Sequence, residues 1–332
     1  MTIVVPTLRG GVALERAIAC LRRQTFRDFL TVIVDNSPGG VARELHSPPQ
    51  MIVIENERNV GFGEAVNQGM AESSSEYICT LNDDAYACPN WLEDLVKAAD
   101  ATPRTVGMCA SQIRLADDPS TLDSAGLDIY PDGTSKQRGN GESVAAHAEP
   151  TDVLLPSGCA ALYRREMIEQ VGEFDASYFL YCEDTDVGLR GQLAGWSCRY
   201  VPSAVVEHDY SRSSGRASPM KAFYVERNRL YTVVKTFPIV LWPWVPLFSL
   251  WRYMAHALAG ASGRGLAADI QKQEGILAPA RIVLSAHRHA LAAFPRLWRA
   301  RRSVRARTTL GTWSFIQLLR RYSVSAWKIV GQ

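Results

Sequence analysis

The sequence lacks the features of a disulfide-rich or secreted protein. It contains seven cysteines, an odd number, and none of them form a C-x-x-C pair. Several stand inside apolar runs, as buried free thiols do, which argues against a disulfide framework and predicts a reducing compartment. The chain also begins directly on an apolar run, without the basic and apolar segments of a signal peptide. We therefore expect a cytoplasmic protein, and we find no internal repeat or low-complexity tract in it.

Acidic residues are missing from the last part of the chain, although the formal net charge is only +2. From Arg281 onward there is no Asp or Glu, while arginines are frequent, so this region needs anionic partners or open water. A long apolar run is missing too. Residues 237–250 are almost wholly apolar, but they contain three prolines and are shorter than the roughly twenty residues of a spanning helix.

This apolar and basic region allows two interpretations. Tryptophan favours the membrane–water boundary, and basic residues attract anionic lipid head groups, so we expect residues 237–332 to contact a membrane surface. The alternative is a buried helical hairpin with a solvated basic face.

The sequence does contain a regular alternation of strands and helices. Hydrophobic residues make up 47% and charged residues 21%, as in a globular protein. Strands are expected at residues 2–5, 31–34, 51–54 and 77–81, with helical spacing between them. This order predicts a mostly parallel sheet covered on both faces, with ligands at the carboxyl ends of its strands.

Polar residues follow three of these strands, at residues 6–9, 35–37 and 82–84. Asp and Asn also make good turns, so each strand end alone has a simple explanation. Three such ends in one sheet favour a shared crevice. Carboxylates held close together repel one another, so a cation between them is stabilising. Oxygen ligands suit magnesium or manganese, especially beside phosphate.

An acidic cluster begins a later helix. Glu183, Asp184 and Asp186 follow an aromatic stretch at the helix N-terminus, where negative charge is stabilised. Helix capping explains one acid but not all three. A carboxylate that faces a closed cleft can accept the proton of an attacking hydroxyl. His208 follows a strand expected at residues 199–206, where a histidine can bind metal but is more often a packing residue.

Taken in order, these pieces resemble the family 2 glycosyltransferases, in particular the bacterial rhamnosyltransferase-like branch. The resemblance extends from the first strand to about residue 236. The matching segments are VVPTLR (4–9), VDNS (34–37), NVGFG (59–63), LNDDA (81–85), SGCAALYRR (157–165), VGEFD (171–175), FLYCEDTDVGLR (179–190) and VPSAVVEH (201–208).

The resemblance implies the α/β fold called GT-A, a Rossmann-like, mostly parallel sheet of nucleotide-diphospho-sugar transferases, here with a C-terminal helical extension. It also implies inverting transfer without a covalent intermediate. We expect residues 1–110 to bind the nucleotide sugar and residues 111–236 to hold the acceptor and the catalytic groups. Residues 237–332 would form the basic, partly apolar extension.

The resemblance also assigns individual residues. Asp184 matches the catalytic base, and Glu183 orients the acceptor. Asp84 and His208 match the metal ligands, for Mn²⁺ or Mg²⁺. Gly158 and Trp196 shape the acceptor site. The nucleotide-sugar pocket is expected to contain Pro6, Thr7, Arg9, Asp35, Asn59, Gly61, Asn82 and Asp83.

Two departures from the family pattern are informative. Asn82 stands where the first acid of the D-x-D motif is expected, so Asp84 becomes the main metal ligand. Gly195 replaces the arginine of the Q-x-x-R-W motif of processive synthases, which predicts the addition of one or a few sugars.

The sequence therefore predicts transfer from dTDP-rhamnose or a UDP-sugar to a glycan or polyprenyl-linked glycan in cell-envelope polysaccharide synthesis. We expect the enzyme to be peripheral on the inner face of the plasma membrane, with no nucleic-acid partner. One alternative is a sugar-phosphate nucleotidyltransferase, which would leave Glu183, Asp184 and His208 without roles. The other is a non-catalytic nucleotide-sugar-binding scaffold.

Overall fold

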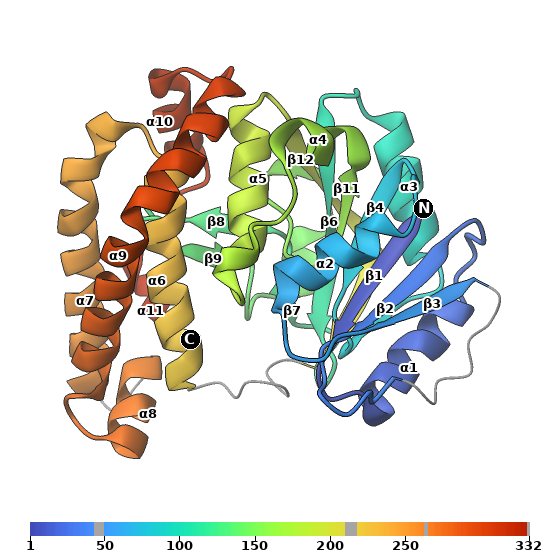
Figure 1. Cartoon of the computed structure of the whole chain (residues 1–332), viewed down its shortest axis with the longest axis horizontal. Helices are drawn as coiled ribbons and strands as arrows, with labels where there is room; N and C mark the ends of the chain where they lie inside the picture. Colours follow the sequence, from blue (N-terminus) through green and yellow to red (C-terminus); the bar gives the residue numbers. More distant parts are fainter. Residues whose placement is uncertain (43–49, 210–217, 262–264, 331–332) are drawn as a thin grey trace. The chain divides into compact units, whose positions relative to one another are not determined.

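The computed structural model of the chain describes residues 1–42, 50–209, 218–261 and 265–330 (Figure 1). The chain divides into two compact units. The first comprises Met1–Leu127 and Gln137–Arg212, and the second comprises Asp128–Lys136 and Ser213–Gln332. The boundaries expected at residues 110 and 236 stay predictions. In the structure, helix α6 (Pro219–Thr236) belongs to the second unit, together with the C-terminal helices.

The first unit is built on one large sheet with the strand order β10-β12-β6-β11-β4-β1-β2-β3, to which β5 and β7 add at the side. Its strands are β1 (Thr2–Thr7), β2 (Leu30–Asp35), β3 (Met51–Glu55), β4 (Tyr77–Leu81), β5 (Ala85–Ala87), β6 (Val106–Leu115), β7 (Leu122–Ser124), β10 (Thr151–Val153), β11 (Ala160–Arg164) and β12 (Ser197–His208). Two further short strands, β8 (Leu127–Ile129) and β9 (Ser135–Gln137), pair with each other.

Strand directions place several carboxyl ends at one edge. Strands β3, β2, β1 and β4 are parallel, and β12 runs parallel to β6. Strand β11 lies antiparallel between β4 and β6, so β4 and β6 again point the same way. The expected α/β class with a mostly parallel sheet is confirmed. The antiparallel insertion of β11 is an addition that the strand pattern did not predict.

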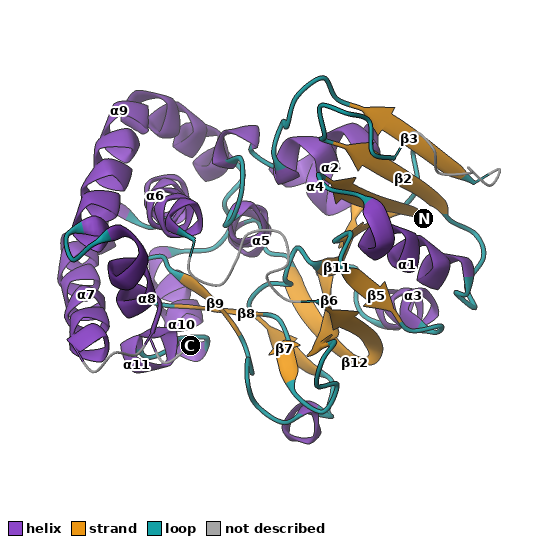
Figure 2. Cartoon of the chain, turned by 90° about the horizontal axis from the view of Figure 1, so that it is seen from below, coloured by secondary structure: helices purple, strands orange, loops and turns teal. Residues whose placement is uncertain are grey.

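Helices cover both faces of this sheet because alternate strand residues point to opposite sides (Figure 2). On β1, Ile3 and Val5 join the core beneath α1 (Gly11–Arg22) and α3 (Trp91–Ala101), whereas Val4 joins the core beneath α2, α4 and α5. These three helices span Phe62–Ala71, Arg165–Val171 and Glu183–Leu193. All seven cysteines are free, as expected.

The second unit is helical over most of its described residues. It contains α6, the 3₁₀ helix η3 (Ile239–Trp244), α7 (Val245–Ala261), α8 (Gly265–Glu274), α9 (Ala278–Ala306), α10 (Thr312–Arg321) and α11 (Ala326–Val330). Helix α6 packs along α9 (Figure 1). The expected C-terminal helical extension is confirmed. No helix in the described part of the chain is both long and apolar enough to cross a membrane.

A network of buried charges lies inside the second unit. Arg252 contacts both Asp132 and Glu226 at 2.8 Å, and Arg229 forms a close ion pair with Glu226. The Ser249 hydroxyl donates a hydrogen bond to Asp132. The network joins α6, α7 and the turn after β8. Breaking a buried ion pair leaves an uncompensated charge, so these contacts hold the three segments together.

Candidate active site

The ends of β1 and β4 meet at the shared edge of the sheet. The two strands are parallel neighbours, and the Thr7 hydroxyl donates to an Asp83 carboxylate oxygen at 2.6 Å. The Gly10 amide in turn donates to Thr7 Oγ1. Burial raises the pKa of Asp83 to about 6, the nearby charge of Asp84 adds to this, and the Thr7 hydrogen bond opposes it. Two residues predicted for the nucleotide-sugar pocket are thus in direct contact.

Asp35 ends β2 at the same edge and is fully buried. One carboxylate oxygen accepts the Ser37 amide at 2.8 Å, and the other accepts the Ala42 amide at 2.7 Å. Its visible role is therefore to hold the loop after β2, and direct contact with a nucleotide stays a prediction. Pro6 pairs with Val34 of β2, and Arg9 is exposed on the loop after β1.

Asp84 and His208 are neighbours because β5 pairs with the end of β12. This pairing sets Ala85 opposite His208, and the His208 Nε2 atom lies 3.2 Å from Asp84 Oδ1. On the other side of the ring, His208 Nδ1 lies 2.8 Å from Asp123 Oδ2. A carboxylate can only accept, so Nδ1 donates to Asp123 and Nε2 donates to Asp84. Burial opposes protonation of His208, but Cys159 and the hydrogen bonds with Asp123 and Asp84 outweigh it and raise the pKa of His208 well above its usual value. A cation that took the place of the Nε2 proton would leave Nδ1 protonated toward Asp123 and would meet the Nε2 lone pair.

Asp123 is the functional candidate that the sequence analysis missed. It lies on β7 and is buried, and its other oxygen accepts a hydrogen bond from Asn140. A histidine metal ligand usually donates its second ring N–H to such a carboxylate, which fixes the tautomer and the ring orientation. The only sequence signal for Asp123 is one acid in a short apolar strand.

The Asp84–His208 pair fits a divalent cation. Adjacent ligands of an octahedral ion with bonds near 2.1 Å lie about 3 Å apart, close to the separation seen here. A carboxylate oxygen and a neutral imidazole nitrogen both suit manganese. No group of three or more His, Cys, Asp or Glu side chains arranged for a metal occurs among the described residues. Further ligands would therefore come from water or from phosphate oxygens.

Glu183 and Asp184 begin α5. Asp184 is half-buried, and its carboxylate accepts the Gly158 amide at 2.9 Å and the Thr185 amide at 2.6 Å. Burial raises its pKa, and these hydrogen bonds partly oppose the rise. Glu183 is 7% exposed and its Oε2 atom has no hydrogen-bond partner. Burial and then the charge of Asp184 raise the pKa of Glu183 well above its usual value. Both groups bind protons more readily than they would in water.

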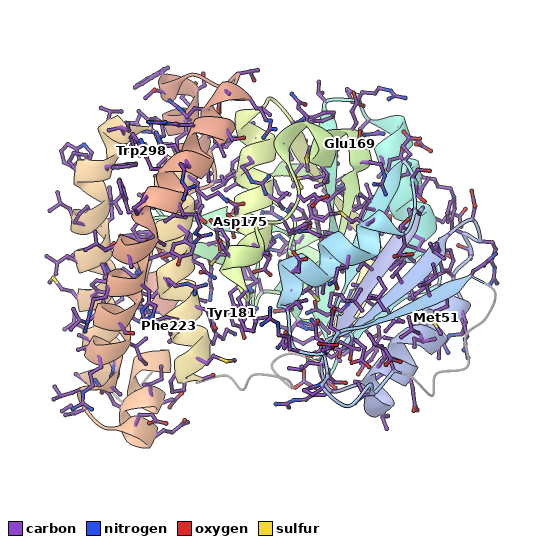
Figure 3. All side chains as sticks on the ribbon, in the orientation of Figure 1. Met51, Glu169, Asp175, Tyr181, Phe223 and Trp298 are labelled. Atoms are coloured by element: carbon purple, nitrogen blue, oxygen red, sulfur yellow. The ribbon has the colours of Figure 1, made fainter. Side chains whose placement is uncertain are left out.

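An unusual backbone segment carries these two acids. Phe179, Tyr181 and Cys182 have φ values of 65°, 67° and 67°, a region that residues other than glycine rarely adopt. Tyr181 is labelled in Figure 3. Such strain persists only where the surroundings enforce it, and it often marks functional sites.

The glycine loop of residues 59–63 holds that segment in place. The Phe62 amide donates to the Phe179 carbonyl at 2.8 Å, and Asn59 Oδ1 accepts the Gly61 amide. A Cβ atom on Gly61 would lie 2.3 Å from the Phe179 oxygen, so only glycine fits there. Asn59 and Gly61 therefore have a clear structural role, and their predicted contact with the nucleotide stays a prediction.

Two adjacent residues join the acidic helix start to the Asp84–His208 pair. The Gly158 amide binds Asp184, while the Cys159 carbonyl accepts the Asn82 amide at 2.9 Å. The Cys159 thiol also hydrogen-bonds the His208 side chain. The structure thus brings Asp84, Asp184 and His208 to one part of the first unit.

Trp196 is a correction to the expected acceptor site. It precedes β12, whereas His208 ends that strand. Between Ser197 and His208, β12 runs beside β6 from Val106 to Leu115, a length of about 30 Å. Its side chain is buried in the core and donates to Gln170 at 2.7 Å. Trp196 is therefore a packing residue at the opposite end of β12, and we leave it out of the site. Gly158, by contrast, lies in the site.

A sheet of this topology, with carboxylates and a histidine at the carboxyl ends of its strands, has the GT-A fold of solved glycosyltransferases. The chain belongs to glycosyl transferase family 2, whose family model matches residues 2–172. A model for glycosyl transferase family group 2 matches residues 137–328.

Curated relatives agree with this assignment. An N-acetylglucosaminyl-diphospho-decaprenol L-rhamnosyltransferase of Mycobacterium tuberculosis is 29% identical over 242 residues, which cover 65% of this chain and 78% of the relative. Rhamnosyltransferase WbbL of Escherichia coli is 40% identical over 67 residues, which cover 20% of this chain and 25% of the relative.

Solved structures share the fold. Mannosyltransferase PcManGT from Pyrobaculum calidifontis, in complex with GDP-Man and Mn²⁺, matches with a TM-score of 0.52 and 18% identity over 92% of this chain and 85% of that one. GalNAc-T7, solved with UDP, GalNAc and Mn²⁺, matches with a TM-score of 0.58 and 17% identity over 70% of this chain and 47% of that one.

Proposed function

We propose that the chain is an inverting, metal-dependent glycosyltransferase that moves a sugar from a nucleotide-diphosphate donor to a hydroxyl group of a lipid-linked glycan. The observation that carries the proposal is the connection made by Gly158 and Cys159. These two residues tie the carboxylate of Asp184 to the Asp84–His208 pair, so a proton acceptor and a pair of metal ligands share one site.

Asp84 and His208 are the proposed metal ligands, with Asp123 orienting the His208 ring. When bound there, Mn²⁺ or Mg²⁺ would offset the negative charge that grows on the departing diphosphate. The Mn²⁺ in the two solved structures named above is consistent with this assignment.

Asp184 is the proposed general base. The Gly158 and Thr185 amides orient its carboxylate, and its raised pKa suits it to accept the proton of the attacking hydroxyl. Attack from the face opposite the leaving diphosphate inverts the configuration at the anomeric carbon. The unpartnered Oε2 of Glu183 is the group that we propose hydrogen-bonds the acceptor.

The donor side of the site consists of the residues at the ends of β1, β2 and β4, together with the loop that holds residue 179. We propose that they line the pocket for the base, ribose and phosphates, either by direct contact or by shaping the loops. They are Pro6, Thr7, Arg9, Asp35, Asn59, Gly61, Asn82 and Asp83.

The relatives narrow the substrate class. The name of the Mycobacterium tuberculosis relative supports rhamnose as the transferred sugar and an acceptor carried on a polyprenyl diphosphate. Of the two expected donors we therefore propose dTDP-rhamnose rather than a UDP-sugar. Both are typical of cell-envelope polysaccharide synthesis. An acceptor of this kind favours a cytoplasmic enzyme at the inner face of the plasma membrane. The glycine at position 195 favours the addition of one or a few sugars.

A donor screen tests this proposal. The protein is incubated with Mn²⁺ and either dTDP-rhamnose or UDP-sugars, with and without a polyprenyl-diphosphate-linked amino sugar, and nucleoside diphosphate release is measured. We expect release from dTDP-rhamnose, increased by the acceptor, and a product of inverted configuration. Release of pyrophosphate would support a nucleotidyltransferase instead. Binding without turnover would support a scaffold, and a retained configuration would overturn the inverting mechanism.

A further inference from the structure

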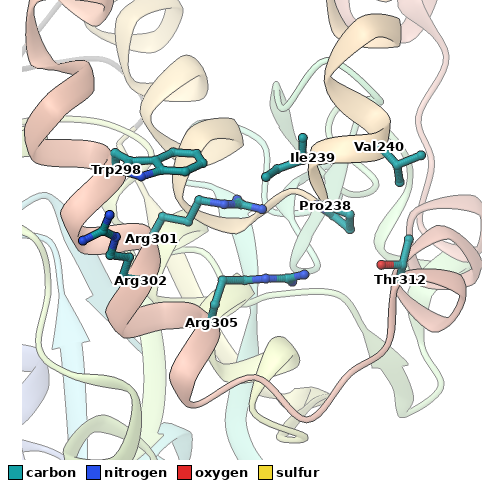
Figure 4. A pocket seen from close by; sticks show the side chains of 8 residues that line it. All are labelled: Pro238, Ile239, Val240, Trp298, Arg301, Arg302, Arg305 and Thr312. Atoms are coloured by element: carbon teal, nitrogen blue, oxygen red, sulfur yellow. The ribbon is translucent and has the colours of Figure 1, made fainter.

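A pocket of about 340 Å³ lies within the second unit (Figure 4). One wall is the segment Pro238, Ile239 and Val240, which leads into η3. The opposite wall is the last part of α9, and Thr312, the first residue of α10, completes the lining. The α9 residues that line the pocket are Trp298, Arg301, Arg302 and Arg305.

The three arginines of this pocket have no acidic partner among the described residues. Arg301 is 4% exposed and donates to the Val234 carbonyl at 2.9 Å, and its guanidinium lies over the Trp242 ring. Burial, together with the charge of Arg305, lowers the pKa of Arg301 to about 10. Arg302 and Arg305 are exposed. Since no acid occurs in the sequence after Arg281, neighbouring residues of this region cannot neutralise the charge.

An anion that enters this pocket would meet several donors. Arg301 and Arg305 extend from α9 toward Pro238 and Thr312 (Figure 4). Thr312 begins α10, whose N-terminus has no side-chain cap, so its first-turn amides are free of helical partners. Guanidinium groups match phosphate oxygens in geometry and charge, and helix N-termini also favour anions.

Exposed apolar side chains continue from the rim of the pocket. The apolar side chains of Ile239 and Val240 are 52% and 61% exposed to solvent. Helix α7 follows, and its inner side is held by Ser249 and Arg252 in the buried charge network. Its outer side is apolar and exposed, through Leu247, Phe248, Leu250, Trp251, Met254 and Leu258. An exposed apolar surface of this kind marks a binding surface for a protein or a membrane.

We propose that the pocket binds the phosphate group of an anionic phospholipid while Ile239, Val240 and the outer side of α7 enter the lipid layer. An arginine pocket next to an exposed apolar surface favours a lipid bilayer over a soluble phosphate as the ligand. A soluble phosphate would bind the arginines but would leave the apolar surface without a partner. Basic groups beside exposed tryptophan and leucine are typical of interfacial helices on anionic membranes. This inference refines the proposed membrane location and does not depend on sugar transfer.

Vesicle binding by the full-length chain tests the proposal. Cosedimentation is measured with phosphatidylcholine vesicles, with and without phosphatidylglycerol, for the wild-type chain and for the double variant Arg302→Gln/Arg305→Gln. The matched control is Arg288→Gln/Arg299→Gln, which removes the same charge from exposed positions of α9 outside the pocket. We expect binding that requires phosphatidylglycerol, a loss of about 30-fold for the pocket variant and a much smaller loss for the control.

A second variant tests the apolar half of the surface. Leu247→Ser/Trp251→Ser changes exposed side chains, so folding is retained, and we expect weaker binding although all arginines remain. The proposal is overturned if the control and pocket variants lose equal affinity, since diffuse charge would then explain binding. It is also overturned if phosphatidylcholine alone binds equally well. Release of the protein from vesicles by glycerol phosphate at low concentration would identify a soluble anion as the ligand.

The donor screen separates this inference from the proposed function. The pocket variant keeps every residue of the proposed active site, so it should release nucleoside diphosphate from a soluble donor at the wild-type rate. If no variant releases nucleoside diphosphate but vesicle binding follows the expected pattern, the enzymatic proposal fails and the membrane pocket stands.

Discussion

Replacement of Asp123 by asparagine tests the arrangement around His208 most directly. The carboxylate of Asp123 accepts His208 Nδ1 at 2.8 Å with one oxygen and Asn140 Nδ2 at 3.0 Å with the other. Asparagine has nearly the same shape but only one acceptor oxygen, so one of these two donors must face an NH₂ group. If the NH₂ group faces His208, it donates to Nδ1, and the ring proton moves to Nε2. The nitrogen that faces Asp84 then loses its lone pair.

The size of the effect follows from this geometry. Removing a carboxylate that orients a histidine ligand typically lowers metal affinity 10- to 100-fold, or about 1.4 to 2.7 kcal/mol. We expect an effect of this size for Asp123→Asn, because the residue is buried and water cannot replace the lost contact easily. The free energy of unfolding should change less, since the side-chain volume is conserved.

Manganese binding is the appropriate assay because it does not require turnover. The dissociation constant is measured by calorimetry or by the electron paramagnetic resonance signal of free Mn²⁺, with nucleoside diphosphate present. Asp118→Asn is the matched control. Asp118 hydrogen-bonds Ser120 and Thr121 on an exposed turn that precedes β7. Wild-type affinity in Asp123→Asn, together with weakened binding in Asp84→Asn, would refute the orienting role. Unchanged affinity in both variants would refute the metal site.

Three further changes test other parts of the structure. Asp184→Asn should keep donor binding, measured by calorimetry, and lower transfer by about 10²- to 10⁴-fold; near-normal turnover would refute its role as the base. Gly61→Ala, at φ 88° and 2.3 Å from the Phe179 oxygen, should lower stability in denaturant by about 1–3 kcal/mol and reduce turnover, whereas Gly39→Ala, with open space around it, should do neither. Glu226→Gln should cost about 3–5 kcal/mol at neutral pH because it leaves buried arginines unpaired. Burial opposes the ionisation of Glu226, but its arginine partners hold its pKa below the usual value. The stabilisation of the fold by ionised Glu226 is therefore fully present above the ordinary carboxyl pKa, and it is lost as the pH falls further into acid. A difference in thermal stability between the wild type and Glu226→Gln that is as large in acid as at neutral pH would contradict this reasoning.

Much of the fold was predictable because its signals are local. The run at residues 77–81 is wholly buried in β4, as its apolar composition indicated, and the polar residues after β1 and β4 do meet. The helix that begins at Glu183 also starts where the acidic cluster predicted. Each of these conclusions needs only the period of apolar residues and the chemistry of neighbouring side chains.

Other features were not predictable because they depend on pairing between distant segments. The antiparallel position of β11 between β4 and β6 leaves no mark on its own apolar sequence. Asp123 gave no signal, because its importance comes from the pairing of β7 with β6 beside the end of β12. The family resemblance assigned Trp196 to the acceptor site, and only the length and direction of β12 show that it lies at the wrong end.

Local pattern and side-chain type were enough to predict the fold class, the family resemblance and the residues able to carry the chemistry. Which of those residues lie close to one another depends on the folding of distant segments onto one another. Strand order and register place Gly158 and Cys159 between Asp184 and His208, and they place Asp123 behind the histidine ring. Such contacts arise from packing between segments far apart in the chain, and no local stretch of sequence specifies them.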